Sequence, residues 1–264
     1  MANVIAIMNE KGGVGKTATA TTLAYLLAKR GFKTALIDFD GQGHASQLYG
    51  IENLNGLDVT ISTLINSIIE DEDKPLPAPE SYIIKSKGID LIPANSELFM
   101  LERNLSKFDF SEYTLSKYVN TIKCNYEYII LDCMPQIGKP MVNAMLCADS
   151  IVIPTQSEIL SAQGLTELLK HYHSISKNCN KNIKIAGILI TMDRGGTRVS
   201  KKVNSIIEDT FAGKINIFGA KIPRSTKVPE ACLYQMTVCE FAPKDPAAIA
   251  YEMFTKELIE NGAA

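Results

Sequence analysis

The sequence lacks the features that place a chain in a membrane or in an oxidising compartment. No stretch approaches the roughly 20 apolar residues that span a bilayer, and the first residues have neither a basic region nor a long apolar run. We therefore expect no membrane span and no signal peptide. The six cysteines form no C-x-x-C pair and no metal-ligand spacing, and most lie in or beside apolar runs, where a free thiol behaves as a small hydrophobic group. This usage indicates a protein of the reducing cytoplasm.

Large charge imbalance is also absent from the chain as a whole. Its 264 residues carry a formal net charge of -2, which excludes neither nucleic acid nor a membrane surface as a partner, because the distribution of charge matters more than its sum. The length suffices for one sizeable α/β domain, and we expect residues 1–264 to form it. Only about three residues precede the first expected strand, so we expect no separate N-terminal DNA-reading domain.

Apolar strand-like runs alternate with segments of helical periodicity. This alternation predicts an α/β fold with a single doubly wound, mostly parallel sheet and helices on both faces. The expected strands, which are nearly continuous apolar runs, are residues 4–8, 34–39, 89–92, 128–132, 150–154, 185–191 and 217–222. The expected helices are residues 17–29, 97–105, 112–122, 158–176, 198–211 and 246–259. Residues 71–80 are acidic and contain three prolines, so we expect an exposed loop there within the domain.

A glycine-rich segment follows the first expected strand. Residues 11–17 read KGGVGKT, and a strand that leads into such a turn is typical of a loop that holds a nucleotide phosphate. Lys16 would supply positive charge to the β- and γ-phosphates, and the Thr17 hydroxyl can bind Mg²⁺. The general pattern has a glycine where this chain has Glu10, and the loop starts with a second lysine, Lys11. Lys11 is either a solvated loop residue or a group that completes a site on another subunit.

Three aspartates stand where expected strands end. Asp132 closes the strand at 128–132, where it is placed to hold a metal-bound water, although an acid at a strand end can also cap a helix. Asp38 and Asp40 are two residues apart at the end of another strand, so both side chains could point towards the same phosphate pocket. An isolated Asp-x-Asp is more often ordinary loop chemistry, so these two need their context.

That context is a resemblance to the ParA/MinD group of deviant Walker A P-loop ATPases. The segment KGGVGKT resembles their deviant Walker A signature. Residues 34–43, TALIDFDGQG, are similar to the strand that ends in Asp-x-Asp-Pro-Gln-Gly, and residues 128–135, YIILDCMP, to the Walker B strand that ends in Asp-x-x-Pro. The three segments occur in the family order, and the similarity extends through residues 222–224 almost to the end. The chain looks like the short partition ATPases without an N-terminal DNA-reading domain.

The resemblance implies an ATPase that uses ATP and Mg²⁺ and turns over slowly until a ParB-like partner stimulates it. Catalysis falls to Lys16, to Asp40, which orients or activates the attacking water, and to Lys11, which contacts the partner's nucleotide in a homodimer that sandwiches two ATP molecules. The metal is assigned to Thr17, Asp38 and Asp132. The nucleotide is assigned to Lys11, Gly12, Gly13, Val14, Gly15, Lys16, Thr17, Ala18, Met192 and Pro223.

Three positions depart from the family pattern. Ala18 replaces a second threonine after the loop, and Met134 replaces the first proline of the Walker B tail. Gly41 replaces the proline of Asp-x-Asp-Pro-Gln, which should loosen the loop that carries Asp40. We expect these changes to affect the rate of hydrolysis and not nucleotide binding.

Positive charge is concentrated late in the chain. Residues 191–227 carry a net charge of +5, so the remainder carries -7. This asymmetry is typical of a phosphate-binding face, although a solvated charged helix would look the same. Arg198, Lys201 and Lys202 are spaced to share one helix face. The resemblance adds Arg224, with Lys227 beside it, as contacts to non-specific DNA in the ATP dimer, and implies a nucleoid-associated cytoplasmic protein that partitions a plasmid or chromosome.

Three other functions use the same kind of nucleotide site. A MinD-like protein needs a basic amphipathic C-terminal helix, but the last helix here has Glu252, Glu257 and Glu260 against Lys256 alone, so we expect no membrane binding. An iron–sulphur reductase related to the nitrogenase iron protein needs two suitably placed cysteines per subunit, and Cys133 fits better as part of a strand end. A scaffold ATPase that positions a protein assembly, with DNA only as a track, is not separated from DNA partition by the sequence.

Overall fold

A seven-stranded sheet organises the chain. The computed structural model describes residues 2–71, 73–157, 159–195, 198–211 and 213–262, with the backbone alone at 159–164 and 198–201. The sheet has the order β3-β4-β2-β5-β1-β6-β7, and all neighbours are parallel except β3 and β4. The strands are β1 (Asn3–Ile7), β2 (Thr34–Phe39), β3 (Ile84–Ser86), β4 (Ile89–Ile92), β5 (Tyr128–Cys133), β6 (Ser150–Gln156) and β7 (Lys184–Thr191). The predicted α/β fold with a mostly parallel sheet is confirmed.

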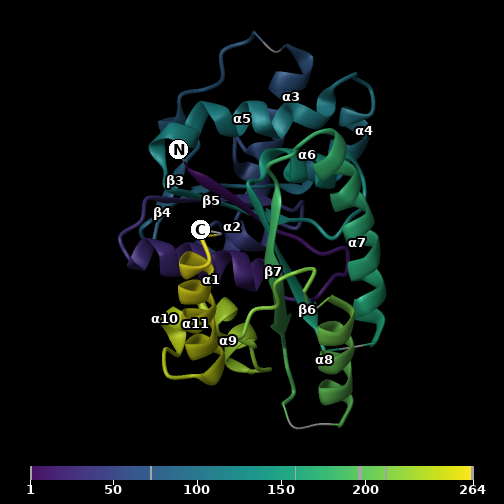
Figure 1. Ribbon diagram of the computed structural model, residues 1–264. Helices are drawn as coiled ribbons and strands as arrows, with labels where there is room; N and C mark the ends of the chain where they lie inside the picture. The colour runs from purple at the N-terminus through teal and green to yellow at the C-terminus, as the bar shows by residue number, and fades with distance from the viewer. Residues whose placement is uncertain (1, 72, 158, 196–197, 212, 263–264) are drawn as a thin grey trace.

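Helices cover both faces of this sheet (Figure 1). One face packs against α3 (Ile61–Glu70), α4 (Leu101–Leu105), α5 (Thr114–Ile122), α6 (Lys139–Cys147), α7 (Ile159–Asn178) and α8 (Arg198–Phe211). The other face packs against α1 (Lys16–Lys29), α2 (His44–Leu48), α10 (Val238–Phe241) and α11 (Pro246–Glu260), with α9 (Lys227–Leu233) beside α10. Every residue of β2 and β5 is buried, which explains why these strands are almost continuously apolar up to the aspartate that precedes their last residue.

The predicted strand at 217–222 is wrong. This segment makes one isolated bridge to β7, between Ile217 and Ile188, and a second bridge joins Pro223, just beyond the segment, to Asp193. Between the bridges, the N–H groups of Gly219 and Ala220 donate to the two carboxylate oxygens of Glu257 on α11, at 3.0 and 3.3 Å. Because these donors turn towards a helix, they are lost to a strand ladder, and the segment stays irregular.

Several short elements are not predicted by the sequence analysis: β3, α2, α3, α6, α9 and α10. Of these, α3 has the clearest local signal. Its apolar residues Ile61, Leu64, Ile65 and Ile68 follow helical spacing, and all four are buried. The predicted helix at 97–105 begins instead as a 3-10 helix, η3 (Ser96–Met100), before α4 continues it.

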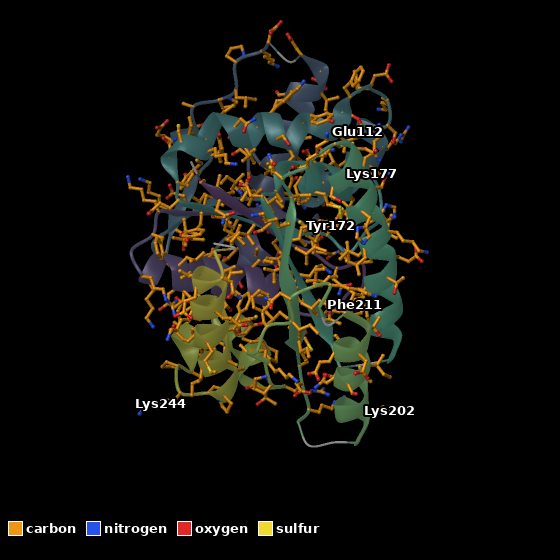
Figure 2. All side chains as sticks on the ribbon, viewed as in Figure 1. Glu112, Tyr172, Lys177, Lys202, Phe211 and Lys244 are labelled. Carbon is orange, nitrogen blue, oxygen red and sulfur yellow. The ribbon has the colours of Figure 1, made fainter. Side chains whose placement is uncertain are left out.

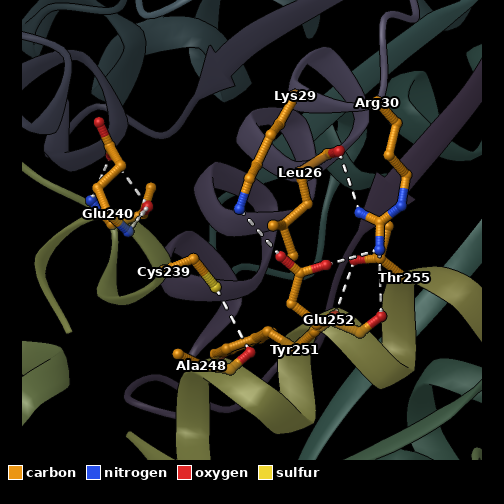
Figure 3. Close-up of polar contacts among 10 residues, drawn as sticks. Leu26, Lys29, Arg30, Cys239, Glu240, Ala248, Tyr251, Glu252 and Thr255 are labelled. Atoms are coloured by element: carbon orange, nitrogen blue, oxygen red, sulfur yellow. Dashed lines mark hydrogen bonds and ion pairs between the residues drawn. The ribbon is translucent and has the colours of Figure 1, made fainter. Parts of the chain in front are cut away.

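The C-terminal helix is fastened to α1 by charge as well as by apolar packing (Figure 3). The Glu252 carboxylate of α11 accepts from Lys29 Nζ at 3.3 Å and from Arg30 Nη2 at 2.7 Å, while Arg30 Nη1 donates to the Leu26 carbonyl at 3.1 Å. On the inner side of α11, Phe254 and Leu258 are fully buried. These contacts fix α1, the helix that begins at the glycine-rich loop.

Residues 71 and 73–78 lie in neither helix nor strand, and most of them are exposed. Leu76 is partly buried against the core and tethers this acidic segment to the body. Within the described chain, no helix is both long and apolar enough to cross a membrane.

Candidate nucleotide-binding and catalytic site

The glycine-rich loop runs from the end of β1 to the first turn of α1. Gly13 has φ 74° and Gly15 has φ 85°, in the left-handed region that a residue with a Cβ adopts only at a cost. A Cβ on Gly12 or Gly13 would meet no atom within 4 Å, so the loop opens onto free space at these two residues. The loop therefore has both the turn and the room that a bound phosphate requires.

Hydrogen bonds with β6 and β7 hold the loop from behind. Asn9 donates from Nδ2 to the Pro154 carbonyl at 2.7 Å and accepts at Oδ1 from the Lys11 N–H at 3.0 Å. The Thr191 hydroxyl donates to the Val14 carbonyl at 2.8 Å. The loop is thus positioned by the chain itself, which reduces the ordering that a ligand must impose on it.

Gln156, the last residue of β6, joins the loop to the residue that follows β7. Its Nε2 donates to the Gly13 carbonyl at 2.8 Å and to the Met192 sulfur at 3.0 Å. Met192 itself has φ 50° and is partly exposed. Pro223 forms an isolated bridge with Asp193, so both residues assigned to the nucleotide outside the loop lie at the end of β7.

Lys16 opens α1 and is nearly buried, with 7% of its surface exposed. Its Nζ donates to the Lys11 carbonyl at 3.0 Å, across the loop. Burial lowers the pKa of Lys16, while the nearby Asp132 and Asp40 carboxylates act to raise it. A buried ammonium ion that is turned into the loop and has acids nearby is suited to an anionic ligand.

Asp38 and Asp132 are direct neighbours across the β2–β5 pair and are both buried. Asp38 is well bonded: Oδ2 accepts from Ser46 N at 2.8 Å and Ser46 Oγ at 2.7 Å, and Oδ1 accepts from Asp40 N at 3.3 Å. Burial nevertheless raises the pKa of Asp38 to about 6. Asp132 differs, because neither of its carboxylate oxygens has a hydrogen-bond partner among the described residues.

The unpartnered Asp132 carboxylate fits a cation. Burial, reinforced by the adjacent Asp38, raises the pKa of Asp132 well above its usual range, and the Thr17 side chain lies close enough to oppose that rise. A hydroxyl and a carboxylate are oxygen ligands of the kind that Mg²⁺ prefers. The donor set of Thr17, Asp38 and Asp132 is therefore compatible with Mg²⁺ held directly or through water.

Asp40 lies in the loop between β2 and α2 and is partly exposed. Its Oδ1 accepts from the Gln42 N–H at 3.0 Å, and its carbonyl accepts from the Gly43 N–H at 2.9 Å. The carboxylate is thus near Lys16 yet accessible to solvent, as an acid that positions a water molecule must be.

A cavity of about 540 Å³ opens beside the first turn of α1. Thr17 and Ala18 line one part of it, and residues from α2 and from the end of α9 line the rest. Its volume is in the range of small-molecule sites.

Cys133 is buried, and burial raises the pKa of its thiol, which does not suit a ligand of an exposed iron–sulphur cluster.

The basic residues are only partly brought together. The side chains of Arg198 and Lys201 lie outside the described residues. Lys202 on α8 and Arg224 are exposed. Lys227 is paired with Glu230 at 2.7 Å. Figure 2 shows Lys202 at the lower end of the molecule, on the side towards which β7 runs.

Ser46, Gln156 and Thr191 escape the sequence analysis. Gln156 and Thr191 act on Gly13 and Val14, which are far away in sequence, while Ser46 acts on Asp38 from the other side of the intervening loop. No local pattern marks them, because their roles depend on how the strands and α2 return to the loop.

Comparison with known proteins places this geometry among nucleotide-binding chains. A family model described as an AAA domain matches residues 2–185. The chain is 32% identical over 262 residues to the sporulation initiation inhibitor protein Soj of Bacillus subtilis, covering 99% of this chain and all of Soj. It is 32% identical over 260 residues to the chromosome partitioning protein ParA of Caulobacter vibrioides, covering 98% of this chain and 94% of that protein.

A solved structure has a fold similar to that of this chain. Cobyrinic acid a,c-diamide synthase from Mycobacterium smegmatis, with bound ATP analog and magnesium, superposes with a TM-score of 0.83 at 25% identity. The match covers 99% of this chain and 96% of the synthase chain. A fold of this kind therefore holds ATP-like ligands with magnesium in a structurally similar protein.

Proposed function

Because this chain belongs to the AAA-domain family, and within it to the ParA-type ATPases, we propose that it couples a slow ATPase cycle to dimerisation and non-specific DNA binding in plasmid or chromosome partition. ATP and Mg²⁺ as cofactors and ATP hydrolysis as the reaction follow from the family. The observation that supports the site assignment best is that an open glycine loop, a nearly buried Lys16 and a buried Asp132 occur together, and that the Asp132 oxygens have no hydrogen-bond partner among the described residues.

Phosphate binding uses the loop and Lys16. The open space over Gly12 and Gly13 accommodates phosphate oxygens, and the N-terminus of α1 favours negative charge there. Lys16, which now donates to a backbone carbonyl, would exchange that contact for the β- and γ-phosphates. Burial of Lys16 strengthens this interaction, because fewer water molecules screen it.

Thr17, Asp132 and Asp38 would hold the metal. When bound, Mg²⁺ neutralises charge on the phosphate oxygens. Asp132 supplies the free acceptor, whereas Asp38, already bonded to Ser46, keeps the strand end and the start of the Asp40 loop in place. Asp40 orients or activates the attacking water, and its partial exposure gives that water access.

Lys11 completes the site of a second copy. Its backbone is fixed by Asn9, which gives the side chain a defined starting point at the rim of the loop. A cationic group that reaches the γ-phosphate of a partner subunit raises the rate of hydrolysis as arginine fingers do, by about 10³- to 10⁵-fold at most. Two copies joined around two ATP molecules would form a dimer that hydrolysis releases.

DNA binding is assigned to Arg198, Lys201, Lys202 and Arg224, with a lesser part for Lys227 because Glu230 neutralises it. A dimer presents two such faces, so its affinity exceeds that of one chain through effective concentration. On α11, Phe254 and Leu258 are buried while Ile249 and Met253 are exposed, so burial alone does not decide the surface. The three glutamates of this helix against one lysine favour DNA over an anionic membrane. We infer a cytoplasmic, nucleoid-associated protein that a ParB-like partner stimulates.

The first test of this function is the oligomeric state. Light scattering with a non-hydrolysable ATP analogue and Mg²⁺ should show a dimer for the wild type and for Lys177→Ala, an exposed lysine of α7. Lys11→Ala should stay monomeric with nucleotide bound, and Lys16→Ala should not bind nucleotide. A wild type that stays monomeric when saturated with the analogue would contradict the proposal.

The second test is DNA binding by fluorescence anisotropy on two unrelated duplexes. We expect binding with ATP and not with ADP, equal for both sequences, and falling steeply with salt. Lys202→Glu should weaken it, whereas Lys177→Glu, towards the opposite end of the molecule in Figure 2, should not. Equal affinity with ADP and ATP, or a strong preference for one duplex, would contradict the assignment.

A further inference from the structure

The loop that carries Asp40 is flexible by composition. It reads DGQG at residues 40–43, with glycine on both sides of Gln42. Gly43 has φ 64°, a conformation that favours glycine at this position. Gly41 has an ordinary backbone conformation that other residues can adopt. Gly41 therefore adds conformational freedom beside Asp40 without any requirement of the turn.

An aromatic ring occupies the space that a side chain at position 41 would fill. A Cβ built on Gly41 would lie 2.9 to 3.0 Å from three ring atoms of Phe99, closer than real Cβ atoms approach other groups. The Phe99 ring thus covers the glycine directly. Its other side is open to solvent, because 51% of the residue is exposed. An apolar ring so exposed contributes little to the core, unlike its neighbour Leu98, which is 1% exposed.

The segment that carries Phe99 is itself firmly held. Leu98 and Leu101 belong to the core beneath η3 and α4. One turn further, the Glu102 carboxylate accepts from the Lys139 N–H at 2.7 Å, at the first residue of α6. A Cβ on Gly138 would lie 2.4 Å from Glu102 Oε2, so this carboxylate also fills the space over a glycine. Residues 96–105 therefore contact both loops that leave the strand ends bearing Asp38 and Asp132.

We propose that Phe99 is a positioning residue that holds Gly41, and through it Asp40, in the arrangement needed for hydrolysis. The ring restricts the backbone at Gly41 by packing against it, where the family pattern has a rigid proline. Glu102 links the same segment to the loop after β5. This proposal rests on the proposed function, in which Asp40 orients the attacking water. A displaced catalytic group of this kind costs up to about 100-fold in rate.

The test is a double-mutant cycle on hydrolysis, measured as single-turnover phosphate release with protein in excess over Mg·ATP. Phe99→Ala should lower the rate about tenfold and leave the ATP concentration for half-saturation within about twofold, because the loop around Lys16 is untouched. Phe99→Tyr keeps the ring and should retain the wild-type rate. Phe110→Ala, which removes an 80% exposed ring elsewhere, is the matched control and should have no effect.

Gly41→Ala closes the cycle. With the ring present, the added Cβ displaces the loop, and the rate should fall about tenfold; with Phe99→Ala, the same substitution should cost at most about twofold. Additive effects, a wild-type rate for Phe99→Ala, or a parallel loss of ATP binding and thermal stability would overturn the proposal.

Asp40→Ala, measured in parallel, separates this proposal from the one on which it rests. If Asp40→Ala is inactive and Phe99→Ala is fully active, only the role of Phe99 fails. If Asp40→Ala hydrolyses ATP at the wild-type rate, the proposed role of Asp40 fails, and the role of Phe99 fails with it.

Discussion

Two aspartates lie side by side at the ends of β2 and β5, and they differ in the hydrogen bonds that their carboxylates accept. Asp38 accepts three hydrogen bonds from Ser46 and Asp40. Asp132, its direct neighbour in the sheet, accepts none in the described part of the chain, although it is equally buried. A buried carboxylate without a hydrogen-bond partner lowers the stability of the folded protein. The fold carries this cost at Asp132, whereas hydrogen bonds to Asp38 reduce it there.

Under the proposed function, the difference separates a carboxylate that shapes the site from one that would bind the metal. Asp38 fastens the start of the Asp40 loop and the start of α2, so its partners are part of the fold. The partner of Asp132 would be supplied from outside, together with the nucleotide.

The largest expected effect is on the pH dependence of stability. The folded pKa of Asp38 is about 6, against an ordinary value of 3.8, so between those values the folded state keeps a proton that the unfolded state has lost. The stabilisation from this group is therefore complete below about pH 4 and lost as the pH rises through 6, by about 3 kcal/mol.

Urea unfolding of the nucleotide-free protein from pH 4 to 7 checks this expectation. The difference in unfolding free energy between the wild type and Asp38→Asn should shrink as the pH rises. The raised pKa of Asp132 acts in the same direction, so Asp132→Asn should also flatten the profile. Identical pH profiles for the wild type and both variants would show that neither carboxylate is held as described.

The next largest effect is on hydrolysis. Asp132→Asn should lower the rate about 100-fold and raise the Mg²⁺ concentration for half-maximal activity, because it removes a carboxylate that we propose to bind the metal. A Mg²⁺ titration of phosphate release measures both quantities. Asp109→Asn, at an exposed position, is the control. An unchanged Mg²⁺ requirement in Asp132→Asn would remove that residue from the metal site.

At pH 7, an alanine substitution should destabilise the nucleotide-free protein at one of the two positions and not at the other. Asp38→Ala leaves the Ser46 N–H and hydroxyl without their acceptor and should cost about 2 kcal/mol. Asp132→Ala removes a buried carboxylate whose oxygens have no hydrogen-bond partner among the described residues, so it should leave stability unchanged or raise it.

Thermal unfolding measures the contrast, since 1 kcal/mol corresponds to about 2–4 °C for a chain of this size. Equal losses in Asp38→Ala and Asp132→Ala would mean that the two carboxylates have the same role.

The smallest effect is expected at Ser46. Its hydroxyl donates to Asp38 and accepts from the Ala94 N–H at 3.1 Å, so Ser46→Ala should cost about 1 kcal/mol. The lost bond should also raise the pKa of Asp38 further, because that bond favours the charged form. Ser62 is an internal control, since it is equally buried but its hydroxyl has no partner among the residues that the structure describes. Ser62→Ala should be neutral or stabilising, and a loss equal to that of Ser46→Ala would discount the Asp38 contact.

Sequence reasoning predicts the parts of this site that depend on local order. KGGVGKT directly follows an apolar strand, and Asp132 ends another, so the loop and the strand-end acid can be placed without tertiary information. The parallel pairing of β2 with β5 then makes Asp38 and Asp132 neighbours, as any parallel sheet with these adjacent strands would.

Contacts between distant segments are what the sequence cannot supply. Residues 217–222 have the composition of a strand, but Glu257 takes their central N–H groups. Likewise, Gly41 reads as a loosened loop until the structure places Phe99, nearly 60 residues later, over it. Both outcomes depend on which helix or 3-10 turn packs nearby, and neither local propensity nor a short motif encodes that choice.

One amide group gives the nucleotide pocket a short path to the basic surface. Gln156 grips the Gly13 carbonyl and the Met192 sulfur at once, and Arg194 follows Met192 by only two positions. A shift of that carbonyl on phosphate binding would therefore act directly on Met192, at the start of the positively charged segment 191–227. Only two peptide units separate Met192, which Gln156 contacts, from Arg194, the first basic residue of this segment.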